Sequence, residues 1–303
     1  MSLAEAEARQ LHVEGVDGST TLWRDARHRL RRNPSAIVGI VLIFLFVAVG
    51  ILAPWLAPEP ANFPRLERIT PGNFPGPSAE HWFGVDQLGR DELSRVIHGA
   101  RYSLVIGVVS VTIGAVVGIL VGAVAGSLGG WVDNALMRLM DMMLAIPGLL
   151  FAIAVAAALG RSLTSIMIAI GVVNIAPIAR LLRGSMLAER ERDYVLALRA
   201  VGVKRRRITM SHMLPNATAP VIVQATLALA TAIIDAAGLA FLGLGSSDPG
   251  IPEWGRMLAE TQSFLQHAPH LAFFPGAAIV LSVLGFNLLG DGLREALDPK
   301  LRR

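Results

Sequence analysis

The chain has 303 residues, of which 53% are hydrophobic and 17% are charged. Soluble domains carry roughly 25% charged residues, so this chain has too few to cover a water-facing surface, and we expect an integral membrane protein. The formal net charge is only +4, and there is no cysteine, which excludes disulfides, thiolate catalysis and cysteine-ligated metals.

Several stretches are apolar over the roughly 20 residues that a helix needs to cross a bilayer. We count six in chain order: 36–57, 102–128, 142–160, 162–179, 213–234 and 271–290. The third and fourth are divided only by Gly160 and Arg161. The fold predicted is therefore all-α with six transmembrane helices, kinked at Pro147 and Pro177, which fall inside the third and fourth spans.

The first 35 residues precede the first span and contain the sequence TLWRDARHRLRR. Arginines grouped around Trp23 are typical of an amphipathic basic helix at the lipid headgroups, with a disordered tail as the alternative. No cleavable signal peptide is evident, because the first apolar run is too long for one.

Lysine and arginine are distributed asymmetrically between the loops. With the N-terminus inside, 20 of the 27 cations fall in inner segments, leaving seven outside: Arg65, Arg68, Arg90, Arg95, Arg101, Arg161 and Arg256. The positive-inside rule then predicts cytoplasmic termini, with the tail at 293–303. Residues 58–100 and 243–270 become extracytoplasmic loops around a five-helix core at 101–292. The cations thus mark a membrane face, and without aromatic interleaving nucleic acid is not an expected partner.

Catalytic motifs are missing from the chain. There is no Gly-Lys-Ser/Thr, hence no P-loop, and no His-Glu-x-x-His. His267 and His270 flank Pro269 on an outer loop, which does not make a metal site. We therefore expect neither an enzyme, nor a bound cofactor, nor a metal. Asp235 and the amides Asn174 and Asn287 lie within apolar spans, where polar groups often line a translocation path.

A basic island, DYVLALRAVGVKRRRITMSHMLPN at 193–216, interrupts the apolar pattern between the fourth and fifth spans. At roughly 3 kcal/mol each, the cations at 190–207 would cost about 20 kcal/mol at the bilayer centre, so the island must be cytoplasmic. Asp193 is placed to cap a helix of about two turns that ends at Gly202. Its apolar stripe, at i, i+3, i+4 and i+7, is formed by Tyr194, Ala197, Leu198 and Val201.

A helix this short is not stable alone and needs a surface to pack against. The membrane interface and a groove on a cytoplasmic protein are both candidates. From the residues alone, the two remain open.

The island resembles the EAA loop of permease subunits in ATP-binding-cassette (ABC) importers with the type I fold. That loop reads Glu-Ala-Ala, three residues, Gly, nine residues, Ile, one residue, Leu-Pro. Gly202 and Leu214-Pro215 match it, and Leu196, Ala197 and Leu198 stand at its first three positions. The departures are Leu196 for Glu, Leu198 for Ala and His212 for Ile. The ending His212, Leu214, Pro215, Asn216 is similar to the peptide-importer branch.

Three further stretches resemble the same branch: HWFGVDQLGRDELSRVIHGARYSL, FLGLGSSDPGIPEWGRMLAE and FFPGAAIVLSVLGFNLLGDGLREALDPKLR. The resemblance is closest to the C-type permease of dipeptide, oligopeptide and nickel importers. It covers the chain from about residue 22 onward and places it in the bacterial inner membrane.

The resemblance implies a coupling helix at about 189–203, which docks into an ATPase subunit through Asp193, Tyr194, Ala197, Leu198, Arg199, Val201 and Gly202. It also implies a second permease, two ATPases that bind ATP and Mg, and an extracytoplasmic binding protein. The substrate expected is a di- or oligopeptide, with nickel or another small solute as the alternative. An ion-coupled secondary transporter or a membrane-embedded hydrolase is less favoured, since no repeat or mid-span catalytic set is present.

Overall fold

The computed structural model describes residues 29–69 and 74–297. Within these ranges every regular element is helical, apart from one isolated bridge between Val85 and Asp91. The basic segment predicted around Trp23 and the end of the predicted tail, residues 298–303, lie outside the described residues. Residues 293–297 of that tail continue the last helix.

The described chain contains five helices that are long and apolar enough to cross a membrane, or six spans if a bent helix pair counts as one. They are α3 (Pro34–Leu56), α4 (Glu92–Leu128), α7 (Leu163–Arg190), α11 (Ala219–Leu239) and α13 (His270–Leu297). Large apolar side chains point away from the bundle, as with Phe44 (72% exposed) and Trp55 (78%) of α3. Apolar surface of this extent on helices of membrane-spanning length is typical of contact with lipid, and the all-α membrane fold predicted from composition is confirmed.

Helix α4 begins earlier than the second predicted span. Asp91 caps its N-terminus by accepting a 2.8 Å hydrogen bond from the Ser94 backbone amide. At about 1.5 Å per residue its 37 residues extend for roughly 55 Å, well beyond a hydrocarbon core of about 30 Å. Residues 92–100, predicted as loop, are therefore helical, because hydropathy detects the apolar part of a helix and not its polar first turns.

The third predicted span, 142–160, is not one straight helix. The chain forms α5 (Gly130–Ala145) and α6 (Gly148–Leu159), which meet at an angle of 94°. Pro147 precedes the first residue of α6 and disfavours the helical conformation for Ile146. The proline therefore separates two helices instead of kinking one. Pro177 does lie inside a helix, α7.

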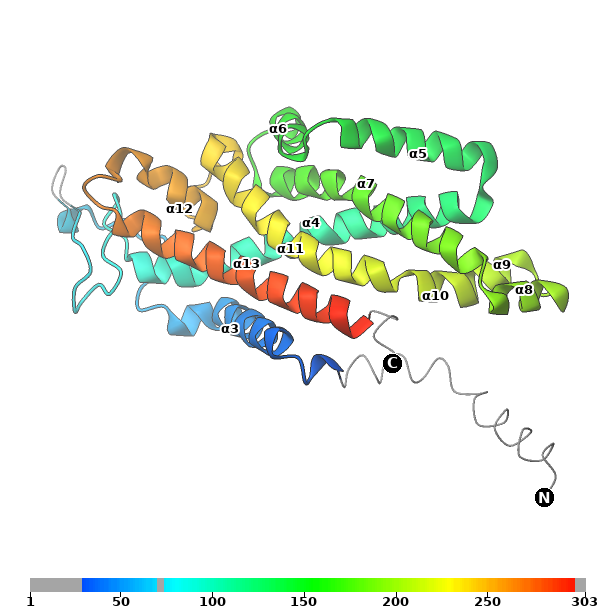
Figure 1. The fold of residues 1–303 in the computed structure, drawn as a ribbon. Coiled ribbons are helices and arrows are strands. Elements are labelled where there is room, and N and C mark those ends of the chain that lie inside the picture. The colour runs from blue at the N-terminus through cyan, green and yellow to red at the C-terminus, as the bar shows by residue number, and fades with distance from the viewer. Residues whose placement is uncertain (1–28, 70–73, 298–303) are drawn as a thin grey trace, which may run out of the picture.

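Helix α7 continues past the predicted end of the fourth span at residue 179, and α5 supplies acidic partners for two of the arginines in this extension. Arg183 donates two 2.6 Å hydrogen bonds to the Asp133 carboxylate. Arg180 lies 3.4 Å from Asp141 in a more exposed pair. Figure 1 shows α5 lying along α7.

Helices α4 and α7 approach closely along a seam of glycines spaced four residues apart. A Cβ atom at Gly122 would lie 2.6 Å from the Ala179 carbonyl oxygen, and one at Gly118 would lie 2.8 Å from that of Ile175. Small residues at this spacing let membrane helices pack backbone to backbone. The complete seam on α4 consists of Gly114, Gly118, Gly122 and Gly126.

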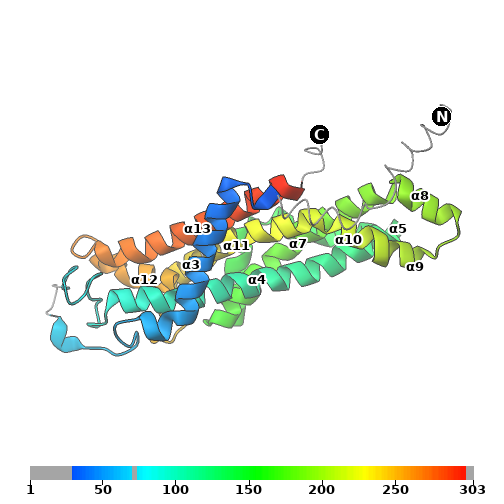
Figure 2. The ribbon, with the colours of Figure 1, turned by 90° about the horizontal axis from the view of Figure 1, so that it is seen from below.

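The bundle has two distinct ends. Figures 1 and 2 place the short helices α8 (Asp193–Ala200) and α9 (Arg205–Ile208) at one end. At the other end lie α12 (Trp254–Thr261) and the segment that joins α3 to α4. The basic island and the predicted outer loops therefore occupy opposite ends, as the charge distribution predicts.

Candidate functional site

The island is held to the bundle by one apolar side of α8. Val195 is fully buried and Leu198 is half-buried, packed in a cluster with Leu182 and Met186 of α7. Burial of one such side chain is worth about 1.5–3 kcal/mol, so this contact stabilises a helix too short to persist alone. Val195 was missed by the sequence pattern and is the most deeply buried residue of α8.

The C-terminal end of α8 follows the Schellman pattern. Gly202 has φ +78°, its amide donates to the Arg199 carbonyl oxygen at 3.0 Å, and the Val203 amide donates to the Leu198 carbonyl oxygen at 3.0 Å. Val203 and Leu198 belong to the same apolar cluster, which completes the motif. The helix stop predicted at Gly202 is confirmed.

The start of α8 differs from the expectation. Asp193 is its first helical residue and Arg192 is the N-cap, without a side-chain cap. Asp193 therefore favours the helix through its charge in the first turn and does not cap it. The anchor at this end is Tyr194, whose hydroxyl donates to Glu189 Oε2 at 2.6 Å and accepts from Asn216 Nδ2 at 3.3 Å. Burial and the Glu189 hydrogen bond raise the pKa of the Tyr194 hydroxyl.

The apolar stripe predicted on α8 is divided between two sides of the helix. Tyr194 and Leu198 face the bundle, whereas Ala197 and Val201 (76% exposed) face away from it. The spacing i, i+3, i+4, i+7 covers a wide arc of the helix, and only the packed neighbours decide which part of that arc faces the bundle. The outward side forms a four-residue apolar face, defined here as the α8 face: Leu196, Ala197, Ala200 and Val201.

The rest of the EAA-like segment continues from α9 through the π-helical η2 (Thr209–Met213) and α10 (Leu214–Ala217) into α11. His212 and Leu214 are half-buried, while Pro215 and Asn216 are exposed. Pro215 lies in the first turn of α10, which follows the π-helical η2 directly within one helical segment. Asn216 closes the segment back onto α8 through Tyr194.

The three candidate pathway residues sit on three different helices. Asn174 of α7 is half-buried and donates to the Ile170 carbonyl oxygen at 2.9 Å. Asp235 of α11 is half-buried and Asn287 of α13 is exposed. Among the described residues no hydrogen bond or ion pair connects any two of them, so the chain by itself does not assemble them into one site.

At the α12 end lies an ionic cluster that the sequence pattern did not reveal. Arg95 Nη2 and Arg90 Nη2 lie 3.1 and 3.3 Å from Glu260 Oε2. Arg90 Nε also bonds Asp86 Oδ2 at 2.6 Å. Both arginine side chains are 1% exposed. The cluster fixes the N-terminal end of α4 to α12, and its signal lay in the alternating charges of the motif VDQLGRDELSR.

Two carboxyl groups at this end have shifted pKa values: Glu253, just before α12, and Glu260, within it. Burial raises the pKa of Glu253 to about 7, against a smaller opposing effect of Arg256. Burial also opposes ionisation of Glu260, but Arg95, Arg256 and Arg90 outweigh it and hold the pKa of Glu260 below its usual value. In the ranges that the structure describes, no group of three or more His, Asp or Glu residues could hold a metal.

Two families match the chain. Residues 118–303 match the binding-protein-dependent transport system inner membrane component, and residues 21–71 match the N-terminal TM domain of oligopeptide transport permease C. The solved MetNI methionine ABC transporter, in inward-facing conformations, shares the fold with a TM-score of 0.55 at 19% identity, covering 67% of this chain and 96% of that chain.

Curated relatives match over nearly the whole length. A dipeptide transport system permease protein, DppC, of Alkalihalophilus pseudofirmus is 47% identical, covering 92% of this chain and 90% of the relative. A glutathione transport system permease protein, GsiD, of Escherichia coli is 44% identical over 94% and 93%, and one of Salmonella paratyphi A is 47% identical over the same shares. Together with the fold and the EAA-like segment, these matches show that the chain belongs to the binding-protein-dependent inner membrane permeases of ABC importers, in the C-type branch.

Proposed function

We propose that the chain forms half of the translocation pathway of an importer for di- or oligopeptides. The relatives that match over more than nine-tenths of the chain are named for dipeptides and glutathione, which supports a peptide substrate. The other half of the pathway comes from a second, homologous permease. Asn174, Asp235 and Asn287 line this pathway only after the two permeases have assembled, which accounts for their separation here.

Energy for import comes from two ATPase subunits, which bind ATP and Mg²⁺, while this chain binds no cofactor. The end carrying α8 faces the cytoplasm, as do both termini, and the α12 end faces the solute-binding protein. The distribution of Lys and Arg supports this orientation, and α8 and α12 lie at opposite ends of the bundle (Figure 2).

The observation that carries the coupling proposal is the α8 face. A helix packed on one side by Val195 and Leu198 and apolar on the other presents unburied surface, with Val201 76% and Leu196 47% exposed. Apolar helix faces of this kind bind hydrophobic grooves. The face, ordered by the Gly202 stop and the Tyr194 hydrogen bonds, is the surface that enters the ATPase. Arg199 and Asp193 lie beside it.

Two substitutions test this role in the assembled transporter. Ala197→Glu places a charge in the α8 face, and Gly202→Pro removes the amide donor and the positive φ that end the helix. Both are expected to abolish peptide uptake while the protein remains in the membrane and the binding protein still docks. Ser211→Glu adds the same charge at an exposed position outside α8 and should leave uptake unchanged. Normal uptake by Ala197→Glu at normal abundance would overturn the coupling role.

A further inference from the structure

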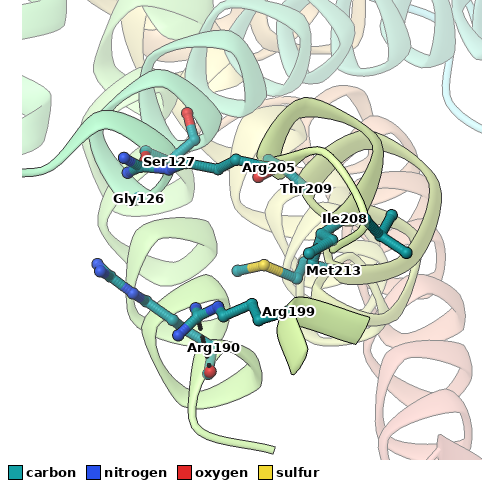
Figure 3. A pocket seen from close by; sticks show the side chains of 9 residues that line it. Gly126, Ser127, Arg190, Arg199, Arg205, Ile208, Thr209 and Met213 are labelled. Atoms are coloured by element: carbon teal, nitrogen blue, oxygen red, sulfur yellow. Dashed lines mark hydrogen bonds between the residues drawn. The ribbon is translucent and has the colours of Figure 1, made fainter. Parts of the chain in front are cut away.

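A cavity of about 330 Å³ opens beside α8, between the C-terminal ends of α4 and α7 and the segment α9–η2. Figure 3 shows the side chains of Arg190, Arg199 and Arg205 around it. The wall opposite contains Ile208 and Met213, which belong to the apolar cluster beneath α8. Three guanidinium groups from three different helices therefore surround one hollow.

In the part of the chain that the structure describes, no carboxylate lies within ion-pair distance of these three guanidiniums. By contrast, Arg183, about two turns before Arg190 on the same helix, has a bidentate carboxylate partner. Like charges around a hollow repel each other, so an anion held between them would be stabilised.

Most of the hydrogen-bonding capacity of the three groups is also unused. Arg205 donates from Nη2 to the Ser127 carbonyl oxygen and, at 3.4 Å, to that of Leu128. Arg199 donates from Nη2 to the Arg190 carbonyl oxygen at 3.5 Å, which Figure 3 marks with a dashed line. A guanidinium carries five N–H donors, so most of the donors in the cavity remain available to an acceptor.

The cavity is separate from the α8 face. At 3.6 residues per turn, Arg199 projects on the same side of α8 as the buried Val195, and the α8 face points the opposite way. A protein groove that covers Leu196, Ala197, Ala200 and Val201 therefore approaches from the side away from the arginines. What fills the cavity must be compact and anionic.

We propose that this cavity binds a phosphate group. Guanidinium forks match phosphate oxygens in pairs, and a phosphate brings more acceptor oxygens and more negative charge to three guanidiniums than a single carboxylate does. Basic pockets at the cytoplasmic ends of membrane helices hold anionic headgroups, and the cytoplasmic location rests on the proposed orientation. The group comes either from an anionic phospholipid or from a soluble phosphate compound.

The test compares two triple variants of the full-length chain in its assembled transporter. The cavity variant removes the three positive charges that line the cavity, by the substitutions Arg190→Gln, Arg199→Gln and Arg205→Gln. The control variant removes three positive charges from exposed neighbours that do not line the cavity, by the substitutions Lys204→Gln, Arg206→Gln and Arg207→Gln. Native mass spectrometry in detergent with added phosphatidylglycerol measures lipid binding, and calorimetry with inorganic phosphate measures the soluble ligand.

The cavity variant is expected to bind the phosphate ligand at least about tenfold more weakly than the wild type, and the control about as well. If phosphatidylglycerol alone shows this difference, the source is the lipid headgroup; if inorganic phosphate shows it without lipid, the source is soluble. Equal losses in both variants would reduce the effect to surface charge and overturn the proposal. So would undiminished binding accompanied by loss of the ATPase, which would place a protein's acidic side chains in the cavity.

A single substitution provides a second test in case the triple variant misfolds. Arg190→Gln removes a guanidinium with no hydrogen bond in the described part of the chain, so the fold does not depend on it. It is expected to weaken phosphate binding several-fold, with unchanged thermal unfolding in the absence of ligand. Unchanged binding by Arg190→Gln would contradict the proposal independently.

Discussion

The Tyr194 hydroxyl donates a 2.6 Å hydrogen bond to Glu189 Oε2, which joins α8 to the last turn of α7. Because Glu189 lies in the last turn of a membrane-spanning helix, this bond links α8 directly to the bundle. A force applied to α8 thus reaches α7 through one short polar contact and through the buried Val195.

Tyr194→Phe removes that bond and should loosen α8 without unfolding the chain. Hydrogen bonds to charged groups are worth about 1.5–3 kcal/mol, so amide exchange in α8 is expected to accelerate by at least about tenfold. Peptide import per ATP hydrolysed should fall. Tyr102→Phe, in the one other tyrosine of the chain, is the control and should change neither quantity. Unchanged exchange in α8 would show that Val195 and Leu198 alone hold the helix.

Gly122→Ala should destabilise the α4–α7 seam. The new methyl group would lie 2.6 Å from the Ala179 carbonyl oxygen, and overpacking of this kind costs about 1–3 kcal/mol. A lower thermal unfolding temperature in detergent is the expected result. Gly184→Ala, in α7, meets no atom within 4 Å and should instead stabilise its helix by up to about 1 kcal/mol. Equal shifts in the two variants would contradict close packing at the seam.

Glu253 should make stability depend on pH. Burial raises its pKa to about 7, so the folded state retains a proton that the unfolded state releases near pH 4.5. Stability should therefore fall as pH rises from about 5 to about 8, by up to roughly 3 kcal/mol for this group. Glu253→Gln should remove this part of the pH dependence of thermal unfolding, and Glu80→Gln, at an exposed site, should not. A slope unchanged in Glu253→Gln would refute the assignment.

Glu260→Gln should weaken the junction between α4 and α12. It would leave Arg90 and Arg95, each 1% exposed, short of a counter-charge, and breaking a buried pair costs about 3–5 kcal/mol. The exposed pair Asp141–Arg180 is the comparison: Asp141→Asn should cost less than about 1 kcal/mol. Thermal unfolding in detergent measures both. If both variants lost less than about 1 kcal/mol of stability, the ionic cluster around Glu260 would be accessible to water.

Local patterns were sufficient for much of this architecture. The apolar spans, the all-α class and the placement of the island at one end follow from hydropathy and charge, which are properties of short segments. Gly202 was also predictable, because a left-handed residue after an apolar helical pattern ends a helix whatever surrounds it. The EAA-like spacing placed Leu214 and Pro215 in the segment that leads into α11.

Other features depend on contacts between distant residues. Hydropathy predicted the end of α5 and all of α6 as one span, whereas the two helices are separated at Pro147 and meet at 94°. Helical spacing grouped Ala197 with Tyr194 and Leu198 in one stripe, whereas packing buries Val195 in the cluster that contains Met186 and leaves Ala197 exposed. Arg95 and Glu260 are 165 positions apart in the sequence, and only the tertiary structure brings their charges into contact.

The sequence by itself thus determined which segments enter the membrane and at which end the island lies, because transfer between water and lipid depends on local composition. The tertiary structure decided which face of α8 is exposed, how closely α4 approaches α7 and where Arg190, Arg199 and Arg205 converge. These depend on packing and electrostatics between segments far apart in the chain, which no single stretch of sequence contains.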